Sequence, residues 1–172
     1  MLVVVGGLPG VGKTTISAAL ARRTGANFVR IDAIETGIAL ASATASPEIG
    51  PAGYVVGNQI VRSMLIEQLD VIVDAVNPVA EARQGWVDLA DELGADVLTI
   101  EVVCRDVELH RRRVGSRRPN LPGHDVPTWD DVTRLSYEPW PDVDVVVDSA
   151  DVDDDDLIDA LASSMRRSDP PG

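Results

Sequence analysis

The residues that most clearly carry chemistry lie near the start of the chain. The eight residues from Gly7 to Thr14 match the pattern G-x-x-x-x-G-K-[ST] at every position. In this pattern the glycines let backbone N–H groups turn toward phosphate oxygens, and the lysine reaches the β- and γ-phosphates. The threonine hydroxyl is placed to bind Mg²⁺. The pattern therefore predicts a phosphate-binding loop for ATP and Mg²⁺. The residues expected to contact the nucleotide are Gly7, Gly10, Val11, Gly12, Lys13, Thr14 and Thr15.

The amino-acid composition singles out the lysine of this motif. Of the 15 basic residues, 14 are arginine and Lys13 is the one lysine. Its position argues against the alternative that the segment is a glycine turn that binds nothing. GTPases need a further lysine in an N-K-x-D motif to recognise guanine, so this sequence excludes that class.

Length and charge limit the remaining classes of protein. A chain of 172 residues is the usual size of one domain. The net charge of −13 repels phosphate backbones and argues against a nucleic-acid partner.

A single cysteine, Cys104, cannot form an internal disulfide, which favours the reducing cytoplasm. The sequence contains no apolar run of about 18 residues, so we expect no membrane span.

The elements that must position the motif are predicted from apolar runs and helical spacing. Short apolar runs predict strands over residues 2–5, 27–31, 71–73, 96–103 and 143–147. Helices are expected over residues 16–23, 33–40, 54–69, 79–93, 107–114, 128–137 and 152–165. This alternation predicts one α/β domain with a five-stranded parallel sheet and helices on both faces, a P-loop NTPase. We expect the second strand to lie beside the first, at the edge where open α/β sheets bind ligands.

A carboxylate at the end of the third predicted strand, and the residue after it, limit which kind of nucleotide-binding protein this can be. Asp74 follows an apolar run, as the acid that holds Mg²⁺ behind a phosphate-binding loop does. Motor ATPases usually place a glutamate next to activate water, whereas this chain has Ala75. AAA+ machines need a longer chain with a helical lid domain. The class that remains is a small enzyme that transfers a phosphoryl group to a bound acceptor.

From the P-loop to the last strand, the chain resembles the small P-loop kinases of the AAA_33-like family. That group is similar to adenylate kinases, gluconate kinases, polynucleotide kinases and chloramphenicol phosphotransferase. The resemblance implies a nucleoside-monophosphate-kinase-like fold and an ATP-dependent phosphotransferase. Its γ-phosphate would go to a hydroxyl group of a small-molecule acceptor.

The resemblance also implies roles for individual residues around the acceptor. Asp32 resembles the acid that takes the proton of the acceptor hydroxyl, since an alcohol needs a base to attack phosphorus. The alternative role of Asp32 is the N-cap of the next helix, and Glu35, one turn later, could share the site. The stretch from Asp74 to Arg83 resembles the D-x-[TS]-N…R segment of polynucleotide kinases but carries Val76 at the hydroxyl position. Arg83 is thus a candidate acceptor contact or part of a solvated helix face.

An arginine-rich segment, 111–118, resembles the edge of an adenylate-kinase lid, here expected over residues 115–127. In such lids one arginine stacks on adenine and another clamps the phosphates; Arg113 and Arg117 are the candidates. The alternative is a solvated basic helix that balances an acidic protein.

The segment 41–69 is expected to cover the acceptor, as in related kinases. Tyr54, Asn58 and Arg62 recur every four residues and so share one helix face. Two other functions stay open at this point: a 5′-hydroxyl kinase of nucleosides or polynucleotides, and an ATP-binding regulator or ATPase without an acceptor. The identity of the acceptor, the choice of ATP over GTP and the oligomeric state are also open.

Overall fold

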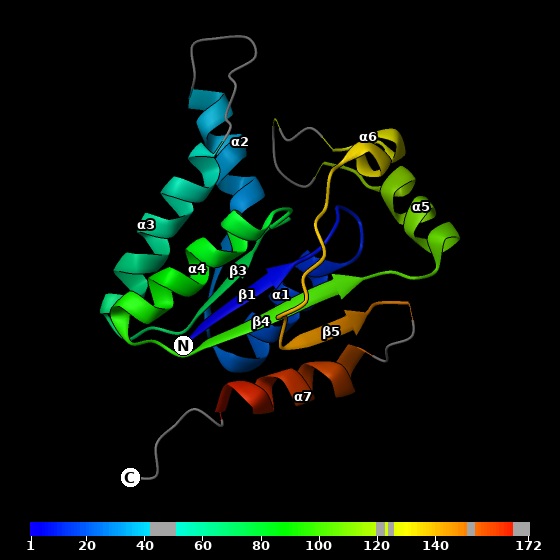
Figure 1. Ribbon diagram of the computed structural model, residues 1–172. Coiled ribbons are helices and arrows are strands. Elements are labelled where there is room, and N and C mark those ends of the chain that lie inside the picture. The colour runs from blue at the N-terminus through cyan, green and yellow to red at the C-terminus, as the bar shows by residue number, and fades with distance from the viewer. Residues whose placement is uncertain (42–50, 120–122, 124–125, 151–153, 167–172) are drawn as a thin grey trace.

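The computed structural model describes residues 1–41, 51–119, 123, 126–150 and 154–166 and shows one α/β domain (Figure 1). Its five strands form one parallel sheet in the order β2-β3-β1-β4-β5. The strands are β1 Leu2–Gly6, β2 Asn27–Arg30, β3 Val71–Asp74, β4 Val97–Val103 and β5 Val145–Asp148. The predicted fold class is confirmed.

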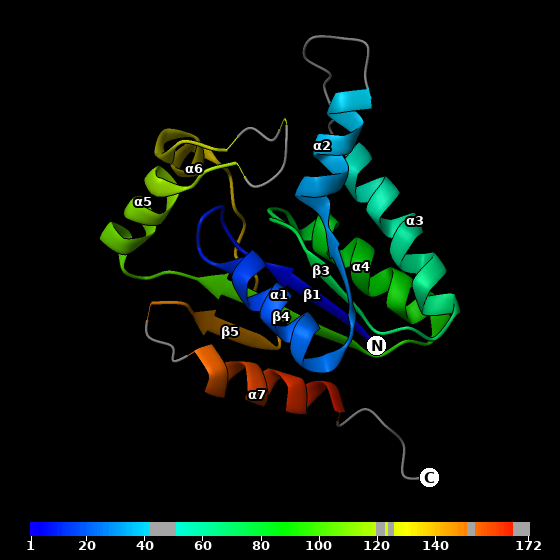
Figure 2. The ribbon, with the colours of Figure 1, turned by 180° about the vertical axis from the view of Figure 1, so that it is seen from behind.

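The helices lie on both faces of this sheet and beyond its carboxyl edge. They are α1 Lys13–Thr24, α2 Ile31–Ala41, α3 Ala52–Ile66, α4 Ala80–Leu93, α5 Val107–Ser116, α6 Trp129–Arg134 and α7 Asp154–Arg166. Helices α1 and α7 cover one face, and α3 and α4 cover the other (Figures 1 and 2). Helix α2 projects from the sheet beside α3, while α5 and α6 lie at the opposite side of the carboxyl edge. Within the described residues no helix is both long and apolar enough to cross a membrane.

Strand β1 is buried along its whole length because helices cover both faces of the sheet. Val3 and Val5 face the core shared with α1 and α7, whereas Leu2 and Val4 face α3 and α4. This two-sided burial explains why the strand is a continuous apolar run and does not alternate with polar residues.

The structure corrects two sequence expectations, one on the neighbour of the first strand and one on the role of Asp32. Strand β3, and not β2, lies beside β1, because its residues pair with β1 on one side and with β2 on the other. Asp32 is not an N-cap, because α2 begins at Ile31 and includes Asp32 in its first turn. Helices α1 and α4 end at Gly25 and Gly94, which both adopt the left-handed conformation that ends a helix. Helix α6 begins with a capping box formed by Thr128 and Asp131.

A buried arginine joins the turn after β3 to the segment before β5. Arg83 is 5% exposed, and its guanidinium donates hydrogen bonds to the carbonyl oxygens of Asn77, Glu138 and Pro139 at 2.6 to 2.8 Å. The same group lies 4.9 to 5.0 Å from the ring centroids of Trp140 and Tyr137. Through these hydrogen bonds Arg83 holds the turn that contains Asn77, a non-glycine residue with a φ of 51°.

We expect Arg83→Ala to lower the free energy of unfolding by about 3 kcal/mol, because it leaves several buried carbonyl groups without donors. Chemical denaturation measures this change. Arg23→Ala is the matched control: Arg23 is exposed and paired with Asp159, and such pairs contribute little. An equal loss for both variants would show that Arg83 does not hold this turn.

Candidate nucleotide and acceptor site

The loop between β1 and α1 has the backbone conformation that its glycines predict. Gly7, Gly10 and Gly12 have φ values of 136°, 84° and 105°, which side chains of L-residues rarely allow. A Cβ atom on Gly7 would also come within 2.2 Å of the carbonyl oxygen of Val102. Only glycine therefore fits at this turn, and α1 begins directly at Lys13, three residues earlier than predicted.

A cavity of about 770 Å³ opens at the carboxyl edge of the sheet, beside this loop. The P-loop and α1 form its base, and residues of α2, α3, α5 and α6 form its walls. Its lining includes the predicted residues Gly10, Gly12, Lys13, Thr14, Thr15, Asp32, Glu35, Tyr54, Arg113 and Arg117. A cavity of this size is in the range of small-molecule sites.

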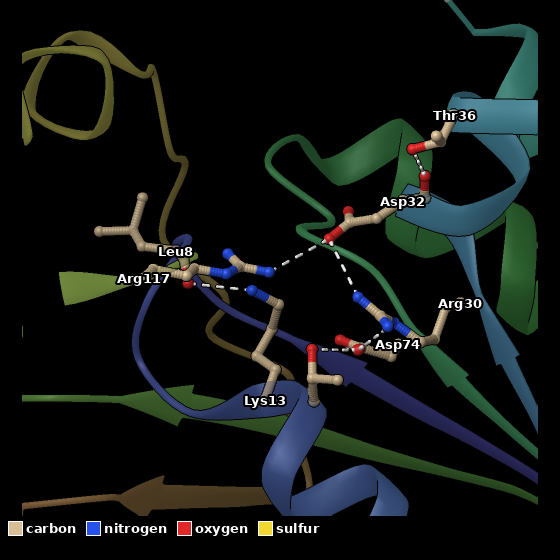
Figure 3. Close-up of polar contacts among 8 residues, drawn as sticks. Leu8, Lys13, Arg30, Asp32, Thr36, Asp74 and Arg117 are labelled. Atoms are coloured by element: carbon tan, nitrogen blue, oxygen red, sulfur yellow. Dashed lines mark hydrogen bonds and ion pairs between the residues drawn. The ribbon is translucent and has the colours of Figure 1, made fainter. Parts of the chain in front are cut away.

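The side chain of Lys13 lies in a buried position at the base of the cavity. Its Nζ donates a hydrogen bond to the carbonyl oxygen of Leu8 at 2.9 Å (Figure 3). Burial lowers the pKa of Lys13, while the carboxylates of Asp74 and Asp32 act in the opposite direction. A bound phosphate would supply the anionic partner that this buried ammonium otherwise finds only in carboxylates.

Thr14 and Asp74 are in direct contact beside the lysine. The Thr14 hydroxyl donates to Oδ2 of Asp74 at 2.6 Å, and Asp74 is 4% exposed. Burial raises the pKa of Asp74, and Lys13 and the Thr14 hydroxyl oppose this shift. Hydroxyl and carboxylate oxygens are the donors that Mg²⁺ prefers, so this pair fits the predicted metal.

Asp32 lies between two arginines at the wall of the cavity. Its Oδ2 is 3.9 Å from Nη2 of Arg30 and 3.8 Å from Nη2 of Arg117 (Figure 3). Arg117 is the C-cap of α5, so this contact joins α5 to α2 across the cavity. The arrangement places a carboxylate opposite the P-loop.

Arg30 is a site residue that the sequence analysis missed. It ends β2 in register with Asp74, and its Nε lies 3.8 Å from Oδ2 of that carboxylate. Its Nε and Nη2 are buried without a hydrogen-bond partner. The signal in the sequence was position alone: a basic residue two positions before Asp32, at the end of a strand that faces a phosphate site.

Arg113 lies against the P-loop and not against Asp32. It donates to Oγ and the carbonyl oxygen of Ser149 at 2.7 and 3.1 Å, and the Ser149 hydroxyl donates to the carbonyl oxygen of Val11 at 2.6 Å. Helix α5 is further fixed to the loop by His110, whose Nε2 lies 2.8 Å from the carbonyl oxygen of Pro9. The two predicted lid arginines thus have different surroundings, one at the P-loop and one across the cavity.

Glu35 and Tyr54 line the cavity on the side of α2 and α3. Burial, and secondarily the charge of Asp32, raises the pKa of Glu35 to about 7. The Tyr54 hydroxyl accepts a hydrogen bond from the backbone N–H of Asn77 at 3.0 Å. Burial is the main cause that raises the pKa of Tyr54 to about 12.

Three predicted acceptor contacts lie elsewhere. Arg83 does not line the cavity and is engaged with backbone carbonyls, so its predicted role is corrected to a structural one. Asn58 and Arg62 share a face of α3 that packs on α4: Asn58 donates to the carbonyl oxygen of Gly85, and Arg62 pairs with Glu92 at 2.6 and 2.7 Å. The helix face was predicted correctly, but only its first member, Tyr54, reaches the cavity.

The predicted lid and acceptor-covering segments are described only in part. Residues 120–122 and 124–125 of the lid, and residues 42–50 of the acceptor-covering segment, lie outside the described residues. Gly115, the expected start of the lid, belongs to α5, which continues to Ser116. On the described side of the gap, Pro127, Asp131, Val132 and Leu135 line the cavity.

Several solved structures share this fold. Kti12 of Chaetomium thermophilum, in complex with ADP-AlF3, has a TM-score of 0.73 and 19% identity over 99% of this chain and 100% of that chain. A sugar kinase from Janibacter sp. HTCC2649 has a TM-score of 0.67 and 18% identity over 97% and 95%. The APS kinase CysC of Mycobacterium tuberculosis, in complex with AMPPNP and APS, has a TM-score of 0.68 and 18% identity over 96% of each chain. At these identities the likeness shows the fold alone.

Comparison with curated proteins gives no match. The family model AAA_33, described as an AAA domain, matches residues 2–131. This match spans the P-loop, Asp32, Asp74 and Arg117, and it covers well over half of the sequence. The chain therefore belongs to the AAA_33 family of P-loop proteins.

Proposed function

We propose that the protein is an ATP-dependent phosphotransferase that moves the γ-phosphate of ATP to a hydroxyl group of a small-molecule acceptor. The observation that carries this proposal is the position of Asp32, which lines the same cavity as the P-loop lysine from the opposite wall. A carboxylate there can accept a proton from a hydroxyl group that faces the terminal phosphate.

The proposed reaction uses the groups of the cavity in fixed roles. The P-loop N–H groups and Lys13 bind the β- and γ-phosphates. Asp32 accepts the acceptor's proton as its oxygen bonds to the γ-phosphorus, and the bond from the γ-phosphorus to the bridging oxygen breaks to release ADP. Lys13 and Arg117 stabilise the charge of the transferring phosphoryl group. Thr14 would hold Mg²⁺ with Asp74 behind it, and the bound ion would neutralise phosphate charge.

Arg117 and the segment around it are proposed to form a lid over residues 115–127. Nη2 of Arg117 lies 3.8 Å from Oδ2 of Asp32, so the proposed phosphate-binding cation and the proposed base form an ion pair. A triphosphate with its higher charge would attract Arg117 and free the carboxylate to act as base. Closure of this kind excludes water from the γ-phosphate. Arg113 is proposed to contact the nucleotide from the P-loop side.

Charge and local sequence favour this function over the two alternatives. The net charge of −13 disfavours a nucleic-acid 5′-hydroxyl kinase. A hydrolase without an acceptor needs a group to activate water, and Ala75 after Asp74 provides none at the usual position. The single cysteine supports a cytoplasmic enzyme.

Lys13→Ala tests the nucleotide part of the proposal. We expect the loss of ATP-dependent phosphoryl transfer with little change in thermal stability, because Lys13 points into the phosphate site and not into the apolar core. Titration with a fluorescent ATP analogue and a transfer assay measure the two effects. Transfer at the wild-type rate would contradict a P-loop kinase.

Asp32→Asn tests the base. The variant keeps the size of the side chain but cannot accept the proton, so we expect kcat to fall about 100-fold or more. The dissociation constant for ATP should change much less, and isothermal titration calorimetry measures it. Full activity would limit Asp32 to an electrostatic partner of Arg30 and Arg117.

Arg117→Ala tests the lid. We expect kcat to fall more than ATP affinity, because the arginine meets the phosphoryl group only after closure. Hydrogen exchange over residues 111–127 should slow when a non-hydrolysable ATP analogue binds to the wild type and slow less in the variant. Equal exchange with and without the analogue would contradict closure and leave a static surface segment.

A further inference from the structure

We propose that the acceptor carries an ammonium group two or three carbons from the hydroxyl that is phosphorylated, and that Glu35 binds this ammonium. The inference rests on the proposed function, since it assigns the substrate class of the same cavity. Such an acceptor is an amino alcohol with an apolar body.

The charged residues of the described cavity lining separate into a cationic and an acidic side, apart from Asp131 on α6, whose carboxylate accepts hydrogen bonds from the Thr128 hydroxyl and backbone N–H. Its cations, Lys13, Arg113 and Arg117, come from α1 and α5, next to the phosphate-binding loop. The opposite wall carries the carboxylates of Asp32 and Glu35, both on α2. An acceptor with a phosphate, sulfate or carboxylate group would meet these carboxylates, whereas a cationic acceptor would meet opposite charge.

Arg30 does not change this division. Its guanidinium lies between Asp32 and Asp74 at 3.8 to 3.9 Å and is not part of the described cavity lining. Its positive charge therefore faces Asp32 in the first turn of α2 and Asp74 at the end of β3, and not Glu35. Glu35, one turn further along the helix, has no such cation beside it among the described residues.

Among the charged residues in the described lining of the cavity, Glu35 is the one whose carboxylate has no hydrogen-bond or ion-pair partner within the described part of the protein. It is half-buried, and in the part of the chain that the structure describes it makes no hydrogen bond or ion pair. A partly desolvated carboxylate without a partner is unfavourable, as the rise of its pKa to about 7 reflects. A ligand ammonium that donates to it would remove this cost.

The packing of α2 on α3 fixes the position of the Glu35 side chain. A Cβ atom on Gly53 of α3 would come within 2.4 Å of Cγ, 2.9 Å of Oε1 and 3.0 Å of Cδ of Glu35. The missing side chain leaves the space in which the carboxyl group lies against the backbone of α3.

The spacing of the two carboxylates sets the distance between the two groups of the acceptor. Residues three apart on a helix have Cβ atoms about 5 to 6 Å apart, which suits an amine and a hydroxyl separated by two or three carbons. The walls beside them are largely apolar: Ile31, Val76, Pro78 and Leu135 line the cavity. They would contact the carbon skeleton, and the Tyr54 hydroxyl retains a proton to donate to a polar substituent.

Three probes of one carbon skeleton test the assignment: 3-amino-1-propanol, 1,3-propanediol and 3-hydroxypropanoate, each also as a phenyl-substituted homologue. The full-length protein is incubated with ATP and Mg²⁺, and the phosphate ester is quantified by mass spectrometry. We expect kcat/KM to be highest for the amino alcohols, at least about tenfold above the diols, with the hydroxy acids lowest.

Glu35→Gln should reduce the ratio of kcat/KM between amino alcohol and diol about tenfold. Gly53→Ala should reduce the same ratio by displacing Glu35, and Glu67→Gln, an exposed carboxylate at the end of α3, is the matched control that should retain it. This ratio is insensitive to a general loss of folded protein.

A higher kcat/KM for diols or hydroxy acids than for amino alcohols, or an unchanged ratio in Glu35→Gln, would overturn the substrate class but leave the proposed kinase standing. If no alcohol of any charge is phosphorylated while the protein binds the ATP analogue, the proposed function itself fails, and the substrate class fails with it.

Discussion

The ammonium group of Lys13 lies buried where the central strand ends, and the rest of the site depends on how that charge is compensated. The P-loop N–H groups and the first turn of α1 add further positive potential at the same point. In the structure, the compensation comes from the carbonyl oxygen of Leu8 and from the carboxylates of Asp74 and Asp32. A polyphosphate fits this position because it brings several anionic oxygens to one place.

The strand order determines which carboxylates reach this cation. Strand β3 pairs directly with β1, so Asp74 lies beside Val5 and contacts Thr14. Strand β2 pairs with the other side of β3, so the first turn of α2 places Asp32 one strand further away, across the cavity. The topology thus separates a carboxylate suited to the metal from a carboxylate suited to the acceptor.

Much of the fold follows from local sequence patterns. Short apolar runs identified all five strands to within about two residues. The signal is clearest for β1 and β3, which are buried along their whole length, whereas β2 and β5 lie at the edges of the sheet and are only partly buried. The order of strands could not be predicted, since pairing depends on contacts between distant segments. The start of α2 was missed because Ile31 and Asp32 follow β2 without any intervening loop residues.

The site was predictable where a motif fixes backbone geometry and less so where packing selects the face of a helix. Asp32 and five of the seven predicted P-loop residues line the cavity, whereas Gly7 and Val11 do not. Arg83 was predicted to contact the acceptor, because the sequence does not reveal that backbone carbonyl groups surround its guanidinium. Asn58 and Arg62 share the face of Tyr54, but that face continues onto α4. Arg30 was not predicted as a site residue, because its contact with Asp74 depends on the register of β2 with β3.

The fate of the γ-phosphate tests the central claim most directly. The protein is incubated with ATP labelled at the γ-phosphate and a mixture of hydroxyl-bearing small molecules, and the label is located by ³¹P NMR and mass spectrometry. The account predicts that the label appears in a phosphate monoester of one acceptor class, with an equal amount of ADP. Label found only in inorganic phosphate, at a rate independent of the acceptors, would contradict it and identify the protein as an ATPase.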